Sequence, residues 1–301
     1  MQKQTLAVVW AMQLLVPLSA GAASWSPDGS MLAYSYIGGP ENIYIVNADG
    51  TDIRLIVVRE QRDFRPEWSP DGSHLVFTTV IDGVHAIVRV DVDGGNLEQV
   101  TRLEEAAGDP DYSPDGTRLL YFTDEPLARD LFVRDVASGK VTTLTDTPDF
   151  EETSPRWAPD GRRIVFVGKK PGDSTESDIW VLDTETGERR NLTDTPETGE
   201  FHPDFSSDGA RVVYIRVEDG SFAVAVRDVG SGEESIIAPG NGFAVLDPHF
   251  SPDDSKVSFT RTDFAEKGEG MPAIVVVSLK DGSEARIAKG LYLSQMAAME
   301  E

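Results

Sequence analysis

One phrase that occurs six times constrains the fold of this chain more than any other feature. It consists of an aromatic residue, two small residues or a Ser-Pro pair, an Asp and a short apolar strand, and its copies follow one another at intervals of 43 to 48 residues. A strand-rich repeat of about 45 residues is typical of a β-propeller blade. The sequence therefore predicts an all-β fold, a six-bladed β-propeller of four-stranded antiparallel blades, over residues 23–290. The anchoring Asp residues of the six copies are Asp28, Asp71, Asp115, Asp160, Asp208 and Asp253.

The same residue types surround each anchor. An aromatic residue stands three positions before the Asp, an aliphatic residue four positions after it and a second aromatic six positions after it. Because residues two apart in a strand share a face, the last two should enter one packing layer between blades. Ser-Pro-Asp-Gly suits a type I turn, so we interpret the anchors as turn formers. A second hairpin in each copy should turn at Asp49-Gly50, Asp93-Gly94, Ser138-Gly139, Thr186-Gly187, Ser231-Gly232 and Asp281-Gly282.

The aromatic-Ser-Pro-Asp-Gly phrase, followed by an aliphatic-x-aromatic strand, resembles the TolB-like propeller family, a relative of WD-type repeats. The resemblance covers about residues 23 to 290. It implies a propeller that serves as an envelope scaffold, as a sugar-active protein or as the gating domain of a prolyl-oligopeptidase-like enzyme. We expect no counterpart here of the N-terminal α/β domain that TolB itself carries.

The first residues read as an export signal. Lys3 is followed by an apolar run and by small residues up to Ala22, which predicts a signal peptide over residues 1–22 and a periplasmic or secreted protein. The alternative is that Gln13 to Pro17 forms an outer strand that closes the ring. Residues 291–301 are expected to be a C-terminal tail.

Composition excludes several classes of function. With 52 acidic and 27 basic residues the formal charge is −25, so binding to nucleic acid is not expected. No cysteine is present, which excludes disulfides and thiol chemistry. We found no Gly-x-Ser-x-Gly, His-Glu-x-x-His or phosphate-binding glycine motif, and no later apolar run long enough to span a bilayer.

A candidate site lies beside the proline that precedes each anchor by five residues. The flanking positions carry charges of both signs and two of the four histidines, and we expect them to meet at the mouth of the central channel, where propellers generally bind ligands. Three interpretations stay open: a ring of salt bridges that satisfies the channel wall, a site for a polar ligand or peptide, or a metal site. The candidate residues are Arg65, Glu67, Asp109, Asp111, Arg156, His202, Asp204, Asp247 and His249.

Two classes of function follow. The first is a non-enzymatic, exported, monomeric scaffold without a cofactor that binds a protein or peptide partner at the channel face. The second is a small hydrolase or lyase acting on a sugar or lactone through His202, His249 and neighbouring acids, with or without a divalent metal. A gating propeller detached from a prolyl-oligopeptidase-like enzyme is a further alternative. Two long loops, Gly168 to Ser177 and Thr262 to Pro272, are candidates for contacts with a partner or for disordered tips.

Overall fold

The computed structural model describes residues 23–35, 41–123, 129–170, 177–196, 198–240, 242–263 and 273–289. The predicted signal peptide, the alternative closing strand at Gln13 to Pro17 and the C-terminal tail lie outside this part of the chain. So do residues 171–176 and 264–272, which make up most of the two long loops.

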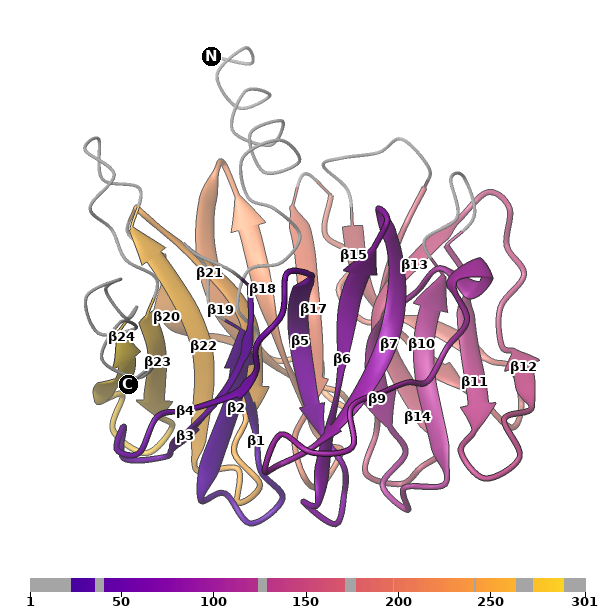
Figure 1. Cartoon of the computed structure of the whole chain (residues 1–301). Coiled ribbons are helices and arrows are strands. Elements are labelled where there is room, and N and C mark those ends of the chain that lie inside the picture. The colour runs from indigo at the N-terminus through magenta and orange to yellow at the C-terminus, as the bar shows by residue number, and fades with distance from the viewer. Residues whose placement is uncertain are drawn as a thin grey trace.

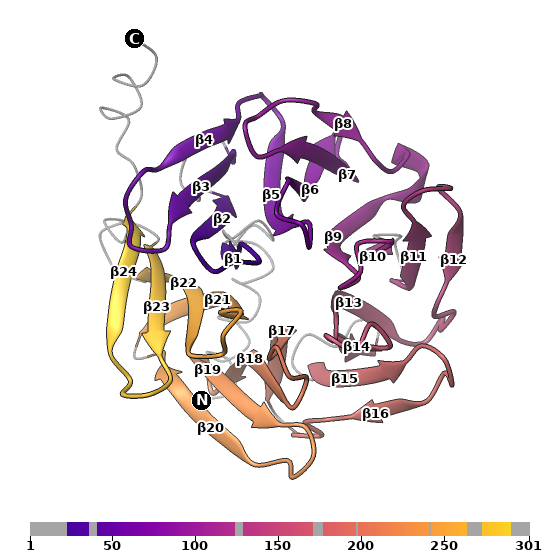
Figure 2. The ribbon, with the colours of Figure 1, turned by 90° about the horizontal axis from the view of Figure 1, so that it is seen from below.

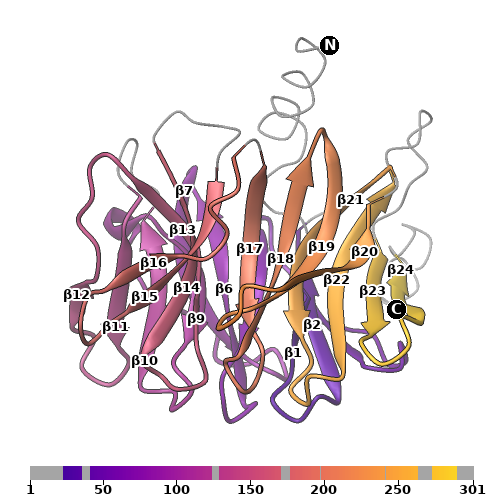
Figure 3. The same cartoon turned by 180° about the vertical axis from the view of Figure 1, so that it is seen from behind.

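Six four-stranded antiparallel blades are arranged in a ring, as the sequence predicted (Figures 1 and 2). We use the word channel for the space enclosed by the innermost strands of the blades. Each blade uses four consecutive strands, the first innermost and the fourth on the outside. Figure 3 shows the opposite side of the ring, where β16 and β20 cross the outside of their blades. A single parallel bridge between Ser177 and Gly199 links the sheets of blades 4 and 5.

The strand bounds, blade by blade, are as follows. Blades 1 and 2 contain β1 (Ala23–Trp25), β2 (Met31–Ser35), β3 (Ile43–Asn47) and β4 (Arg54–Val57), then β5 (Arg62–Trp68), β6 (His74–Ile81), β7 (Val84–Asp91) and β8 (Glu98–Gln99). Blades 3 and 4 contain β9 (Ala107–Tyr112), β10 (Arg118–Thr123), β11 (Leu131–Asp135) and β12 (Val141–Thr143), then β13 (Glu151–Trp157), β14 (Arg163–Lys169), β15 (Ser177–Asp183) and β16 (Arg189–Asn191). Blades 5 and 6 contain β17 (Gly199–Phe205), β18 (Arg211–Glu218), β19 (Ser221–Asp228) and β20 (Glu234–Pro239), then β21 (Phe243–Phe250), β22 (Lys256–Asp263), β23 (Ala273–Ser278) and β24 (Glu284–Lys289). One short 3-10 helix, η1 (Leu103–Glu105), connects blades 2 and 3.

The hydrophobic core is divided into six clusters, one at each contact between neighbouring blades. At the contact between blades 1 and 2, Ile43 and Ile45 pack against Trp68, Leu75 and Phe77. In every copy the aliphatic and the second aromatic residue after the anchor fall in the same cluster. The predicted packing layer is therefore confirmed.

Direct contact between blades 6 and 1 closes the ring. Ile274 and Val276 of β23 pack with Trp25 and Tyr34 of blade 1. The hydroxyl of Ser258 donates a hydrogen bond of 3.1 Å to the carbonyl oxygen of Ala23. Since each described blade is built from strands adjacent in sequence, no strand is exchanged between blades 6 and 1 in this part of the chain.

The predicted turn chemistry is also present. In blade 1 the amide of Gly29, at a φ of +70°, donates to the carbonyl of Ser26 at 2.8 Å, which closes the turn. Asp28 accepts hydrogen bonds from the hydroxyls of Ser26 and Ser30 and from the Ser30 amide. These donors lower the pKa of Asp28 to about 2. The anchor therefore holds the turn as a carboxylate.

At one contact between blades, a hydrogen-bonded pair of residues replaces the proline and glycine found at the other contacts. At the other five contacts the turn proline of one blade packs on the turn glycine of the next, as Pro27 does on Gly72. Between blades 5 and 6 the proline is replaced by Ser207 and the glycine by Asp254. The amide and hydroxyl of Ser207 each donate to the Asp254 carboxylate at 2.8 Å, and a proline has no amide hydrogen to donate.

We expect Ser207 and Asp254 to be energetically coupled. Ser207→Pro alone removes both donors and leaves Asp254 at a φ of +57°, whereas Ser207→Pro with Asp254→Gly restores the Pro-Gly contact of the other blades. The double variant should therefore lose less stability than the two single variants together, by about 1 kcal/mol. Urea unfolding of the four proteins measures this coupling. Single-variant losses that simply add would show that the two positions are independent.

Candidate functional site

The residue before each channel proline has an unusual backbone conformation. Arg65, Asp109, Ser154, His202 and Asp247 all have φ between +47° and +54°, and the pairing of the two inner strands shifts register at the same place in each blade. A left-handed residue before proline is uncommon, because proline favours an extended predecessor. Each shift is a β-bulge, a device that redirects a side chain. We call these five residues the pre-proline ring.

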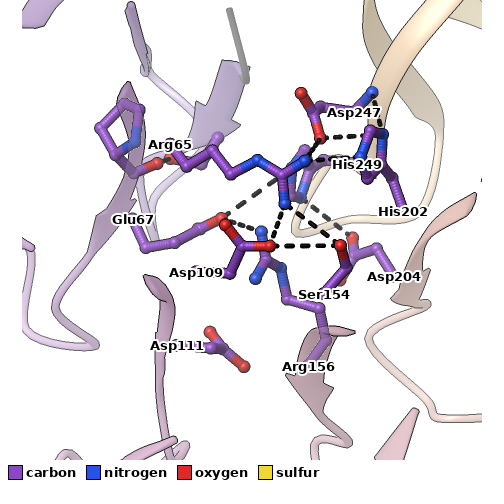
Figure 4. Close-up of polar contacts among 12 residues, drawn as sticks. Arg65, Glu67, Asp109, Asp111, Ser154, Arg156, His202, Asp204, Asp247 and His249 are labelled. Atoms are coloured by element: carbon purple, nitrogen blue, oxygen red, sulfur yellow. Dashed lines mark hydrogen bonds and ion pairs between the residues drawn. The ribbon is translucent and has the colours of Figure 1, made fainter. Parts of the chain in front are cut away.

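Arg65 connects the pre-proline ring across the channel (Figure 4). Its Nη1 pairs with Asp109 and donates to the Ser154 hydroxyl at 3.1 Å. Its Nη2 lies 2.5 Å from His202 Nε2 and 3.7 Å from Asp247 Oδ1. One buried guanidinium from blade 2 therefore contacts side chains from the other four blades of the ring.

The contacts of His202 define its protonation. Nε2 faces the Arg65 donor and accepts from it, whereas Nδ1 faces two groups of Asp247, the carboxylate Oδ1 at 3.1 Å and the backbone amide, which points at Nδ1 at 3.4 Å. With its single proton on Nδ1, the ring donates to Oδ1, the shorter of these two contacts. This is the neutral imidazole. Burial, together with the charge of Arg65, lowers the pKa of His202 to about 4 against the opposing effect of Asp247.

The residues after the prolines form a second layer, which we call the post-proline ring: Glu67, Asp111, Arg156, Asp204 and His249. Arg156 Nη2 donates to Glu67 Oε1 at 2.7 Å. His249 lies between two acids, with Nε2 at 3.9 Å from Glu67 and Nδ1 at 3.5 Å from Asp204.

Two acids of the post-proline ring also hold the next blade. Asp111 accepts the backbone amide of Trp157 at 2.6 Å, and Asp204 accepts that of Phe250 at 3.1 Å. These bonds join blade 3 to blade 4 and blade 5 to blade 6 at the channel wall. The post-proline ring is therefore part of the contact between blades.

Burial and neighbouring charges change the pKa values of three residues in the post-proline ring. It raises the pKa of Glu67, and it raises the pKa of Asp111 to about 7 although Arg156 acts in the other direction. Burial alone would lower the pKa of His249, but the Glu67 and Asp204 carboxylates outweigh it and raise that pKa. His249 is therefore the more readily protonated histidine of the cluster.

All nine candidate residues come together in this two-layer cluster, with Ser154 as a further member (Figure 4). The structure corrects their expected position at the channel mouth. They lie in the middle and later part of the innermost strands, inside the channel, where Asp247 is 2% exposed. The side chains of His202 and Asp204 are partly exposed, at 18% and 19%, and Asp111 is half-buried as well.

Sequence reasoning missed a row of contacts on the side of the ring that carries the anchors. The residue three positions after an anchor packs on the aromatic residue of the next blade: Arg118 lies over Trp157, Arg163 over Phe205 and Arg211 over Phe250, at 4.4, 5.5 and 5.2 Å. His74 meets Tyr112 edge-on at 5.5 Å. The constant spacing of these residues from the anchor was the signal that could have revealed them.

Within the described residues, no group of three or more histidine, aspartate or glutamate side chains is arranged to hold a metal ion. The same part of the chain contains no helix of the length and apolarity needed to cross a membrane.

Comparison with known proteins identifies the family to which this propeller belongs. A family model described as the TolB beta propeller domain matches residues 15–196. The chain belongs to this family.

Members and other propellers share the fold at low sequence identity. TolB from Acinetobacter baumannii is 21% identical with a TM-score of 0.70, over 90% of this chain and 64% of that one, so this chain spans less than two thirds of that TolB. An oligogalacturonate lyase from Vibrio parahaemolyticus is 17% identical with a TM-score of 0.59, over 89% and 77% of the two chains. A puromycin-hydrolyzing peptidase from Mycobacterium tuberculosis is 14% identical with a TM-score of 0.60, over 87% and 44%. Propellers of similar fold therefore occur in proteins named for different activities, and the fold alone does not choose among them.

Proposed function

We propose that this TolB-family chain is an exported, monomeric, non-enzymatic β-propeller that binds a protein or peptide partner at its channel face. The observation that carries the proposal is the convergence of charges of both signs from five blades in one channel. A peptide offers donors, acceptors and charges of both signs, so its chemistry matches such a surface. Export is supported by the N-terminal sequence pattern.

His202 and Asp204 are the residues through which a partner would meet the cluster. They flank Pro203 on the innermost strand of blade 5, and both side chains are partly exposed, at 18% and 19%. Buried ion pairs join Arg65 to Asp109 and Asp247, and Arg156 to Glu67. They would serve as the charged floor beneath the bound segment and keep these two side chains in position.

Affinity capture from the native envelope or culture fluid tests this function. We would compare the protein from Ala23 onward with a His202→Gln/Asp204→Asn variant, which keeps similar side-chain shapes while changing the charge that a partner meets. A matched control is Glu218→Gln, because Glu218 ends β18, at the hairpin that leads to β19, with its side chain 61% exposed. We expect one partner to be retained by the parent and the control and lost by the channel variant.

Equal capture by the parent and the channel variant would contradict the proposal, provided that thermal unfolding shows the variant to be folded. Capture of a hydrolase would instead favour the gating role.

A second candidate, a hydrolase or lyase acting on a sugar or lactone, is supported by the position of both histidines in one cluster with five carboxylates. Turnover of an oligogalacturonate or a lactone by the purified protein, lost in His202→Gln, would favour it over partner binding.

A further inference from the structure

Blade 3 carries a pocket on its outer side, away from the channel cluster. The pocket has a volume of about 280 Å³ and lies between η1 and strands β10, β11 and β12. We call it the blade-3 pocket. Its lining includes Arg102, Glu104, Glu105, Asp130, Phe132 and Val141.

The connection into blade 3 differs from the next two connections. Before blades 4 and 5, threonines fold over a buried glutamate: Thr145 and Thr147 donate to Glu152 at 3.0 and 2.8 Å, and Thr193, Thr195 and Thr198 surround Glu200. Before blade 3, Thr101 keeps the first threonine's role and accepts the Ile87 amide at 2.8 Å. The buried glutamate is replaced by Ala107, however, and the carboxylates of η1 line the blade-3 pocket instead.

A side-chain hydrogen bond fixes the start of η1 beside the blade-3 pocket, and a residue with a left-handed backbone ends it. Glu105 accepts the backbone amide of Arg102 at 3.1 Å, which fixes the start of the turn. Ala106 ends η1 at a φ of +45° and a ψ of +42°, a left-handed conformation that costs free energy in an alanine. Strain of this kind persists only where the surrounding structure enforces it, and it occurs preferentially at binding sites.

The acids of the blade-3 pocket are fixed in position. Glu105 Oε2 accepts the Tyr121 hydroxyl at 3.0 Å, and its Oε1 lies 3.5 Å from Arg134 Nη1. Asp130 Oδ1 accepts the Thr147 amide at 3.1 Å. Exposed Glu104 supplies a third carboxylate. Even with Arg102 and Arg134 counted, the carboxylates outnumber the cations.

An apolar wall completes the blade-3 pocket. Phe132 stacks on Tyr121 with ring centroids 6.1 Å apart, and Val141 beside it is 38% exposed. A ligand that fits must therefore combine apolar surface with positive charge. The volume suits one long side chain better than a large molecule.

We propose that the blade-3 pocket binds an organic cation carried on a short apolar chain, as in the lysine or arginine side chain of a partner polypeptide. The ammonium or guanidinium group would meet Glu104 and Asp130, and the alkyl stem would lie along Phe132 and Val141. The net charge of −25 on the whole chain also favours the approach of basic partners. This site is independent of the channel function.

Titration of the isotope-labelled protein, followed by NMR, tests the blade-3 pocket. The probes are acetyl-Gly-Lys-Gly-amide, its arginine analogue, an uncharged norleucine analogue and butylamine. We expect both basic peptides to shift the signals of Glu104 and Val141 and the norleucine peptide to leave them unchanged. Tighter binding of the peptides than of butylamine would assign the site to a polypeptide, and the reverse order would assign it to a free amine; both support an organic-cation site.

Charge-removing variants complete the test. Glu104→Gln and Asp130→Asn should each weaken binding about 3-fold, because each removes one partly solvated carboxylate from the site. The matched control, Glu98→Gln, removes an equally negative and 62% exposed residue from neighbouring β8 and should leave affinity unchanged. His202→Gln/Asp204→Asn should also bind normally. Binding of the norleucine peptide, an equal loss in Glu98→Gln, or no binding to the parent would overturn the proposal.

Discussion

Arg65→Ala is expected to lower the free energy of unfolding by about 3–5 kcal/mol, because it leaves two buried carboxylates without their shared cation. Arg65 is 4% exposed, and its guanidinium faces Asp109 and Asp247 together. His202 would lose the donor at Nε2 as well. Guanidinium-chloride unfolding followed by circular dichroism measures the loss.

Arg62→Ala is the matched control, since it removes the same side chain three residues earlier in β5. The Arg62 side chain is 49% exposed and pairs with Glu41 near the surface at 2.8 Å. An exposed pair of this kind contributes about 0–1 kcal/mol, so the control should change stability little. A cost for Arg65→Ala as small as that for Arg62→Ala would mean that water or local movement compensates the acids, and the pre-proline ring would then not be held by Arg65.

Phe166→Ala is expected to lower the free energy of unfolding by a similar amount, about 3–5 kcal/mol, through loss of burial and formation of a cavity. Phe166 has no exposed surface and lies in the cluster between blades 3 and 4 with Trp157 and Ile164. Phe77 and Phe259 hold the same place at two other contacts and are equally buried. The three alanine variants should therefore cost about the same.

Thermal and denaturant unfolding of these variants also tests how the ring unfolds. Phe166→Leu should cost roughly 1 kcal/mol, because most of the buried volume is kept. Val136→Ala, at a position 49% exposed, should stay near the parent value. A loss confined to one of the three contacts, or a transition that splits into two steps, would contradict a single cooperative ring.

Much of the fold could be predicted from the sequence because the repeat states the same local rule six times. The anchor turns depend only on Ser, Pro, Asp and Gly chemistry within five residues, and the aromatic rows depend only on the period of a strand. Both signals are local, so they can be recognised in the sequence without knowing how the blades are arranged. Asp254 is the exception, because it stands where the other five copies have a glycine and its explanation lies in Ser207 of another blade.

The candidate site could be predicted as a set of residues but not as a geometry. The repeat shows that Arg65 and Asp109 occupy equivalent positions, and a ring of salt bridges among such residues was one of the interpretations left open. The sequence did not indicate that the single guanidinium of Arg65 would contact side chains from four other blades. The left-handed bulge before each proline contradicts the usual preference at that position, so no propensity argument leads to it. Without the bulge, the depth of the cluster inside the channel and the central place of Arg65 could not be derived.

Because of the bulge, the backbone of the pre-proline ring has the same conformation whichever side chain stands there. Arginine, aspartate, serine and histidine all occupy the same backbone conformation in the pre-proline ring, so the frame does not depend on which side chain it presents. The hydrophobic contacts between blades lie in the six clusters, and none of the pre-proline residues belongs to them. In a propeller of this design, the inward-facing residues can be exchanged with their charges kept in balance. Such exchanges would change which ligands the channel attracts, while the blades keep their fold.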